Sequence, residues 1–140
     1  MKIAVDFDGT IVEHRFPAIG KPKLFAFETL KELQKRDFKL VLWTYRAGRQ
    51  LDEAIEYCKM NGVVFYAVNA NHPDEVLTEK ISRKIDADIF IDDKNLGGFP
   101  GWSRIWEMLD LGPLENEKLQ LPKKKKSWLQ KFLRKKSWIP

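Results

Sequence analysis

The chain of 140 residues has one cysteine and no long hydrophobic run. Cys58 cannot form an internal disulfide bond and has no neighbouring cysteine with which to bind a metal ion. It lies at helical spacing from Leu51, Ala54 and Ile55, which favours a small buried apolar side chain over a nucleophile. No stretch of about 18 apolar residues could cross a membrane, and the N-terminus has no signal-peptide pattern. We therefore expect a cytoplasmic protein.

Acidic residues are missing from one part of the chain, residues 122–140, which carry eight Lys or Arg. The other residues include 17 basic and 20 acidic side chains, so the formal net charge of +5 comes from this tail. At helical spacing the tail holds Trp128, Leu129, Phe132 and Leu133, and this composition is typical of a helix on an anionic membrane surface. We expect the tail to bind a membrane surface or a protein partner. Nucleic acid and a solvated tail without a partner are the less favoured alternatives.

The rest of the chain alternates apolar runs with segments of helical periodicity. Strands are expected at residues 2–6, 38–44, 63–68 and 87–92, and helices at 24–36, 48–61, from about 73 to 84, and 102–109. Leu24, Phe27, Leu30 and Leu33 share one face of the first helix, and Gly62 is a plausible stop for the second. This alternation predicts a parallel sheet with helices on both faces. We expect one domain at residues 1–112, and a linker and basic tail at 113–140.

Polar residues follow three of the expected strands. Asp6 and Asp8 end the first strand, Thr44 ends the second, and Asp92 and Asp93 end the fourth. In parallel sheets, ligands bind at the carboxyl ends of the strands, so these side chains are expected at one rim. Carboxylates held close together repel one another unless a cation is present. Oxygen ligands suit Mg²⁺, and the expected metal site is Asp6, Asp8, Asp92 and Asp93.

This residue set suits phosphoryl transfer. One Asp can attack phosphorus to give an aspartyl-phosphate, and a second can protonate the leaving oxygen and then activate water. Thr44 and Lys84 would bind the phosphoryl oxygens. Gly9 allows a sharp turn beside the ligand, and Gly9, Thr10, Thr44 and Arg46 are the expected substrate contacts. For Arg46, an ion pair at the surface is an equally good interpretation.

Four short motifs carry a family resemblance. DFDGT at 6–10, LWT ending at Thr44, Lys84, and FIDD at 90–93 resemble, in this order, the motifs of the haloacid-dehalogenase-like (HAD) phosphohydrolases. Lys80 is the weaker candidate for the lysine. The resemblance covers residues 1–109 and is closest to small members without a cap domain. It implies a Rossmann-like three-layer α/β/α sandwich with a mostly parallel sheet.

The resemblance also implies roles for single residues. Asp6 would be the nucleophile and a Mg²⁺ ligand. Asp8 would be the general acid/base, with its backbone carbonyl on the metal, and Asp92 would be a direct ligand with Asp93 beside it. Thr44 would bind the phosphoryl group, and Lys84 would neutralise Asp6 and that group. An acid at the Asp8 position is typical of phosphatases rather than dehalogenases.

Two other functions stay open, and so does the substrate. Receiver-type phosphoacceptor domains also use an acid cluster with a Thr and a Lys, but VVFYAVNA offers no Asp after the third strand. A catalytically idle module that docks through its basic tail is the other alternative. Only 38 positions separate Asp6 from Thr44 and 40 separate Thr44 from Lys84, so no cap domain fits between them. An open site would suit a large substrate or a lid from a second subunit, and His14, Arg15, Lys21 and Lys23 in the intervening flap would favour an anion.

Overall fold

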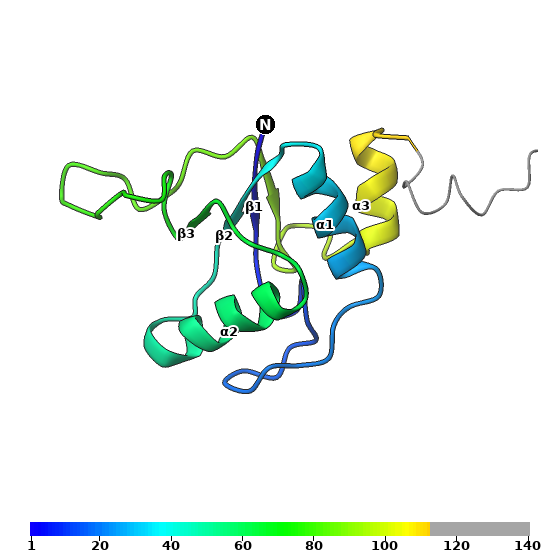
Figure 1. Ribbon diagram of the computed structural model, residues 1–140, viewed down its shortest axis with the longest axis horizontal. Coiled ribbons are helices and arrows are strands. Elements are labelled where there is room, and N and C mark those ends of the chain that lie inside the picture. Colours follow the sequence, from blue (N-terminus) through cyan, green and yellow to red (C-terminus); the bar gives the residue numbers. More distant parts are fainter. Residues whose placement is uncertain (113–140) are drawn as a thin grey trace, which may run out of the picture.

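The computed structural model of the protein describes residues 1–112. Strands and helices alternate along this part of the chain, in the order β1 (Lys2–Val5), α1 (Ala26–Lys35), β2 (Lys39–Leu42), α2 (Gly48–Met60), β3 (Ala67–Val68), β4 (Ile89–Ile91) and α3 (Trp102–Leu109). The strand order across the sheet is β3-β2-β1-β4, and each neighbouring pair is parallel (Figure 1). The expected Rossmann-like α/β fold with a parallel sheet is confirmed. The basic tail lies outside the described residues.

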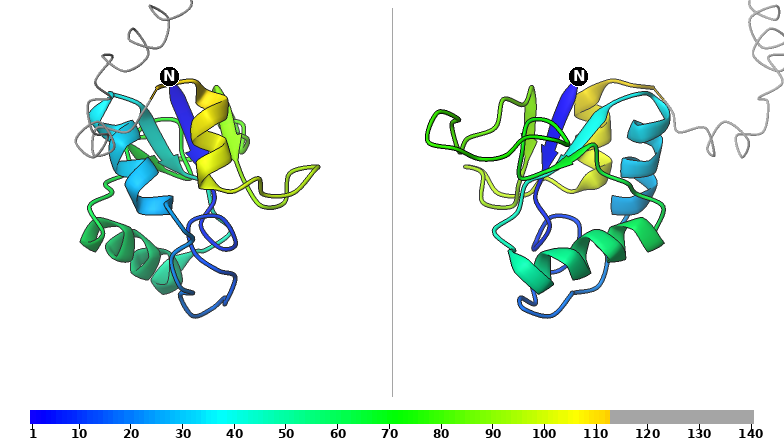
Figure 2. Two further views of the ribbon diagram at one scale, coloured as in Figure 1. Left: turned by 90° about the vertical axis from the view of Figure 1, so that its right-hand side faces the viewer. Right: turned by 60° about the vertical axis from the view of Figure 1, so that its left-hand side comes forward.

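The sheet buries apolar side chains on both of its faces. Ile3 and Val5 of β1 belong to one core cluster, whereas Ala4 between them belongs to a second cluster. This alternation follows from the two-residue period of a strand. Buried residues of all three helices, among them Leu30, Cys58 and Trp102, belong to the first cluster. The second cluster contains no residue of these helices, so within residues 1–112 the helices cover one face of the sheet and the expected helix layer on the other face is wrong. Figure 2 shows α1 and α3 side by side against the sheet.

The helix ends follow the sequence signals with one exception. α1, α2 and α3 lie within the predicted ranges, and Gly62 has a φ of 85° just after the last turn of α2, as a helix stop requires. Leu24, however, is 76% exposed, so its expected place on the buried face of α1 is wrong. Phe25 adopts a left-handed conformation with a φ of 63°, and the helix therefore begins only at Ala26.

The helix expected between residues 73 and 84 is absent, and this prediction is wrong. Hydrogen bonds of Asn71 hold the segment 69–88 in a loop. Its backbone and amide N–H groups donate to the carboxylate of Glu75. Its side-chain oxygen accepts from the backbone N–H of Asp86. Val76 and Leu77 are exposed, so a helix here would gain little from burial of an apolar face. Ile85 does reach the second core cluster. Figure 1 shows the segment projecting beyond β3.

Other predictions concern single residues and lengths. Cys58 is fully buried, and burial raises the pKa of its thiol to about 12, so it is an inert core residue as expected. Trp102 is likewise buried in the core. The third strand is shorter than the apolar run that predicted it. Within residues 1–112, no helix has the length and hydrophobicity that a membrane span requires.

Candidate functional site

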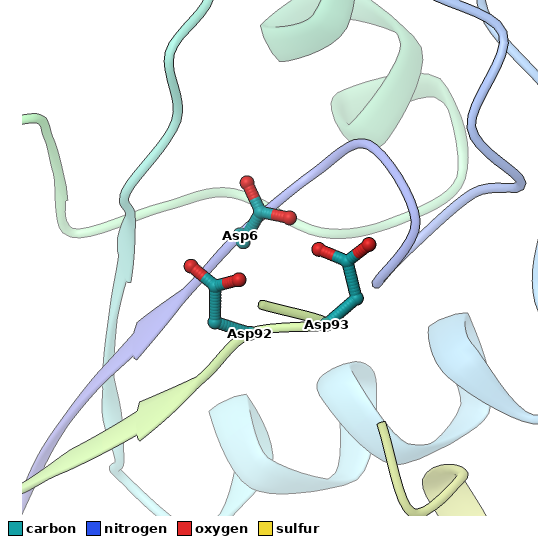
Figure 3. Close-up of side chains that lie close together, drawn as sticks. All are labelled: Asp6, Asp92 and Asp93. Carbon is teal, nitrogen blue, oxygen red and sulfur yellow. The ribbon is translucent and has the colours of Figure 1, made fainter. Parts of the chain in front are cut away.

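Three carboxylates meet at the carboxyl ends of two neighbouring strands. Asp6 follows β1, Asp92 and Asp93 follow β4, and the backbone N–H of Asp6 donates to the carbonyl of Ile91 at 2.9 Å. Each of the three side chains offers an oxygen within 4.8 Å of the other two. Figure 3 shows the three carboxyl groups gathered at this edge of the sheet. The pairing of β1 with β4 therefore joins acids that are 86 positions apart in the sequence.

Thr10 connects the two halves of this cluster. Its hydroxyl donates to Oδ2 of Asp6 at 2.9 Å and accepts from the backbone N–H of Asp93 at 3.0 Å. The indole N–H of Trp102 in turn donates to the carbonyl of Thr10 at 2.9 Å. Thr10 is completely buried, so its expected role as a substrate contact is wrong. Its hydroxyl forms hydrogen bonds with Asp6 and Asp93 and positions these two acids.

Gly9 brings the backbone against the carboxylate of Asp93. Its φ of 86° is unfavourable for residues that carry a Cβ. A Cβ built on Gly9 would lie 2.2 Å from Oδ2 of Asp93, which is far inside van der Waals contact. The glycine thus allows both the turn after β1 and the close approach of the second acid pair. Its expected sharp turn is confirmed.

The cluster favours the protonated form of Asp6 in the absence of a cation. Burial is the largest cause, and together with the charges of Asp92 and Asp93 it raises the pKa of Asp6 to about 7. The hydrogen bonds from Thr10 and from the backbone of Phe7 oppose this shift. A cation held by the same oxygens would favour the charged form instead.

Asp8 does not join the other acids. Its two carboxylate oxygens accept hydrogen bonds from Nε and Nη2 of Arg46, both at 2.7 Å. Arg46 is 2% exposed, and its guanidinium lies 5.0 Å from the ring centre of Phe7 and 5.2 Å from that of Phe16. The expectations that Arg46 contacts substrate or forms a surface ion pair are therefore both wrong. The side chain of Asp8 is therefore engaged by Arg46, and its backbone carbonyl is still the atom that we expect to bind the metal.

Arg46 also holds the flap between β1 and α1. Its Nη1 donates to the carbonyl of Pro17 at 3.0 Å, and its Nη2 donates to the carbonyl of Ala18 at 2.8 Å. The two arms of the flap pair through the backbone N–H of Glu13 and the carbonyl of Lys21 at 2.8 Å. One buried guanidinium thereby joins Asp8, the flap and the β2–α2 loop.

Thr44 lies at the rim as expected. Its backbone N–H donates to Oδ1 of Asn69 at 2.8 Å, and its hydroxyl accepts from the backbone N–H of Arg46 at 3.2 Å. Asn69 follows β3 and has a φ of 48°. We had not expected a role for it, although its place at the carboxyl end of a strand was the signal that could have identified it.

The acids form the floor of an open cleft of about 440 Å³. The residues that line it are Asp6, Asp8, His14, Phe16, Trp43, Thr44, Tyr45, Asp92, Asp93 and Lys94. Lys84, which lies in the segment 69–88, is absent from this lining. Lys94 is the lysine that lines the cleft, and its backbone N–H donates to Asp92 at 2.7 Å. Of the basic flap residues expected near the rim, His14 is found there.

No protein-family model and no curated protein matches the chain. Among solved structures, a conserved protein from Bacteroides thetaiotaomicron is 55% identical over 79% of this chain and 89% of its own, with a TM-score of 0.75. The chain belongs to the family of that protein. The two proteins share the α/β fold described above.

Proposed function

We propose that the protein is a Mg²⁺-dependent phosphohydrolase of the HAD type that forms an aspartyl-phosphate on Asp6. The observation that carries the proposal is the meeting of Asp6, Asp92 and Asp93 oxygens within 4.8 Å of one another. The proposed mechanism requires the carboxylates of Asp6 and Asp92 to lie close enough to bind the same ion. The order of motifs along the chain and their places at the strand ends support the same conclusion.

The donor set fits a hard divalent cation. All side-chain donors are carboxylate oxygens. Burial, together with the charges of Asp92 and Asp93, raises the pKa of Asp6, and a bound cation would favour its charged form instead. The side chains of Asp6, Asp92 and Asp93 would hold the ion together with the backbone carbonyl of Asp8. When bound, Mg²⁺ would supply positive charge that stabilises the phosphoryl oxygens.

Asp6 is suited to act as the nucleophile. The hydrogen bond from the buried hydroxyl of Thr10 fixes its carboxylate relative to the cleft. One carboxylate oxygen forms a bond to phosphorus while the bond from phosphorus to the alcohol oxygen breaks, and the alcohol leaves with a proton. Water then attacks the phosphorus of the aspartyl-phosphate, which releases phosphate and restores Asp6.

Asp8 is the proposed group for proton transfer. Both of its oxygens already accept hydrogen bonds from Arg46, but each keeps a lone pair that can take a proton from the attacking water. A proton passed to the leaving alcohol would have to come from a carboxyl group whose two oxygens are both held by Arg46. Aryl phosphates, whose leaving groups need little protonation, should therefore be turned over faster than alkyl phosphates.

Lys94 and Thr44 would bind the phosphoryl oxygens. Both line the cleft, and a positive charge beside the transferred group is the main electrostatic requirement of this reaction. We assign to Lys94 the role that the sequence pattern had given to Lys84. The cleft that they line is open to solvent.

The fixed Asp8–Arg46 pair favours a second candidate, a cation-binding module without turnover. Hydrolysis of a panel of phosphate esters with and without Mg²⁺ distinguishes the two. We expect hydrolysis to require the metal, Asp6→Asn to abolish it, and Asp8→Asn to slow it by about 10² or more. Activity that survives Asp6→Asn would exclude the covalent route, and absence of any metal-dependent turnover by the folded protein would favour the second candidate.

A further inference from the structure

The wall of the cleft next to the acids is aromatic. Phe16 from the flap and Trp43 and Tyr45 from the end of β2 line it together with the carboxylates. Tyr45 is 96% exposed and Phe16 is 45% exposed. Single exposed apolar side chains are common, but here two exposed rings come from separate segments and line the same cleft. Their area is available to a bound molecule.

The ring of Phe16 and the backbone on both sides of Tyr45 are held in place before any ligand binds. Phe16 lies against the guanidinium of Arg46, which is itself fixed by Asp8 and by two flap carbonyls. Tyr45 stands between Thr44 and Arg46, and the backbone N–H groups of both of these neighbours are hydrogen-bonded. Aromatic surfaces that are already ordered lose little entropy when a flat ring stacks on them.

We propose that the substrate is a nucleoside monophosphate, with its base against Tyr45 and Phe16 and its phosphate at the acid cluster. This inference rests on the proposed function and names its substrate class. Every nucleobase has a planar face that stacks on aromatic side chains. The cleft volume of about 440 Å³ exceeds what a phosphate alone requires. His14 lines the same cleft and offers a polar group to the sugar or the base.

The position of Tyr45 favours a nucleotide over a phenyl phosphate such as phosphotyrosine. The ring of phosphotyrosine is bonded directly to the phosphoryl oxygen, so it would lie at the floor beside Asp6 and Asp92. A side chain that is 96% exposed stands at the outer edge of the cleft. A sugar between the phosphate and the base spans the distance from floor to edge.

Equilibrium binding to the full-length Asp6→Asn protein with Mg²⁺ tests this inference without turnover. The probes are AMP, UMP, ribose 5-phosphate and phosphotyrosine. We expect both nucleotides to bind about tenfold or more tightly than ribose 5-phosphate, which lacks only the base. Tyr45→Leu should abolish most of this preference for nucleotides over ribose 5-phosphate, and Tyr45→Phe should retain it. Phe25→Leu changes a ring that is 46% exposed outside the cleft lining, so it should leave the preference unchanged.

Equal affinity for nucleotides and ribose 5-phosphate would overturn the inference. So would an unchanged preference in Tyr45→Leu, tighter binding of phosphotyrosine than of AMP, or no binding of any probe by the folded protein. These results are separate from failure of the proposed function. Wild-type protein that hydrolyses esters without a preference for a base would refute only the substrate class. Protein that binds AMP selectively but never hydrolyses a phosphate ester would refute only the reaction.

Discussion

Gly9 combines two demands that no other residue type meets, a positive φ and contact with a carboxylate. Gly98 has a similar φ of 80° but open space where a Cβ would be, which makes it a matched control. Gly98→Ala should therefore lose only about 1 kcal/mol through backbone strain. Gly9→Ala should lose more, because Asp93 must also move away.

Chemical denaturation and Mg²⁺ titration of both variants measure this difference. Gly9→Ala should bind Mg²⁺ at least about tenfold more weakly than wild type, since one ligand of the cluster is displaced. Gly98→Ala should bind it normally. Equal Mg²⁺ affinity in Gly9→Ala and wild type would show that Asp93 is not needed for the ion.

Arg46 and Arg49 are two arginines with opposite surroundings. The side chain of Arg46 is fully buried with Asp8, whereas the side chain of Arg49 is 88% exposed and pairs with Glu53 across one helical turn. Arg46→Met leaves a partly buried carboxylate without its partner and should lower the free energy of unfolding by about 3 kcal/mol or more. Arg49→Met should change it by less than about 0.5 kcal/mol. Urea denaturation measures both values, and equal losses would contradict the structural role of Arg46.

At the scale of elements, the two lysines that are candidates for one role lie in different segments of the chain. Lys84 lies in the segment 69–88, while Lys94 lines the cleft just after β4. Lys94→Ala should lower kcat/KM for phosphate esters by about 10- to 100-fold, because the phosphoryl group loses a positive charge. Lys84→Ala should stay within about twofold of wild type. Steady-state kinetics on the two variants decides between them, and the reverse result would restore Lys84.

The elements with strong periodicity were predictable, and those without it were not. α3 occupies the predicted residues, and β1, β2 and β4 fall inside their apolar runs. The segment 69–88 looked helical, but Val76 and Leu77 find no core, and contacts between Asn71, Glu75 and Asp86 decide its shape. Tertiary contacts of this kind leave no periodic signal in the sequence.

Similar reasons explain what was missed in the site. The rule that ligands meet the carboxyl ends of parallel strands predicted that Asp6, Asp92 and Asp93 converge. Asp8 and Arg46 are 38 positions apart, and their pairing depends on how the flap folds over the β2–α2 loop. No spacing rule connects two such loops. Exposure likewise cannot be derived from residue type, so the aromatic wall of the cleft became visible only in the structure.

For the whole molecule, the acid cluster links stability to pH. The pKa of Asp6 is about 7 in the folded, metal-free protein, against an ordinary value of 3.8. Because the raised pKa means that the folded state holds the proton more tightly, this contribution is fully present below pH 3.8 and is lost as the pH rises through about 7.

Metal-free protein should thus lose on the order of 2 kcal/mol of unfolding free energy between about pH 5 and pH 8, with allowance for solvent screening. Asp6→Asn removes the titrating group and should flatten this dependence. Mg²⁺ should stabilise wild type more at the higher pH, where the carboxylates are charged. Urea denaturation in a chelator and in Mg²⁺ provides the measurement, and an equal pH dependence in Asp6→Asn would assign the effect to other groups.

The strand that precedes Asp92 and Asp93 is only three residues long, and within residues 1–112 it is paired on one side alone. Such a strand should open locally more readily than β1 at the centre of the sheet. An ion bound by both Asp6 and Asp92 would connect this edge strand to β1. Binding of the ion and suppression of local opening of β4 would then be one cooperative event. Backbone amide hydrogens of Ile89–Ile91 should then exchange with solvent more slowly when Mg²⁺ is present. Their exchange rate would report whether the metal site is occupied.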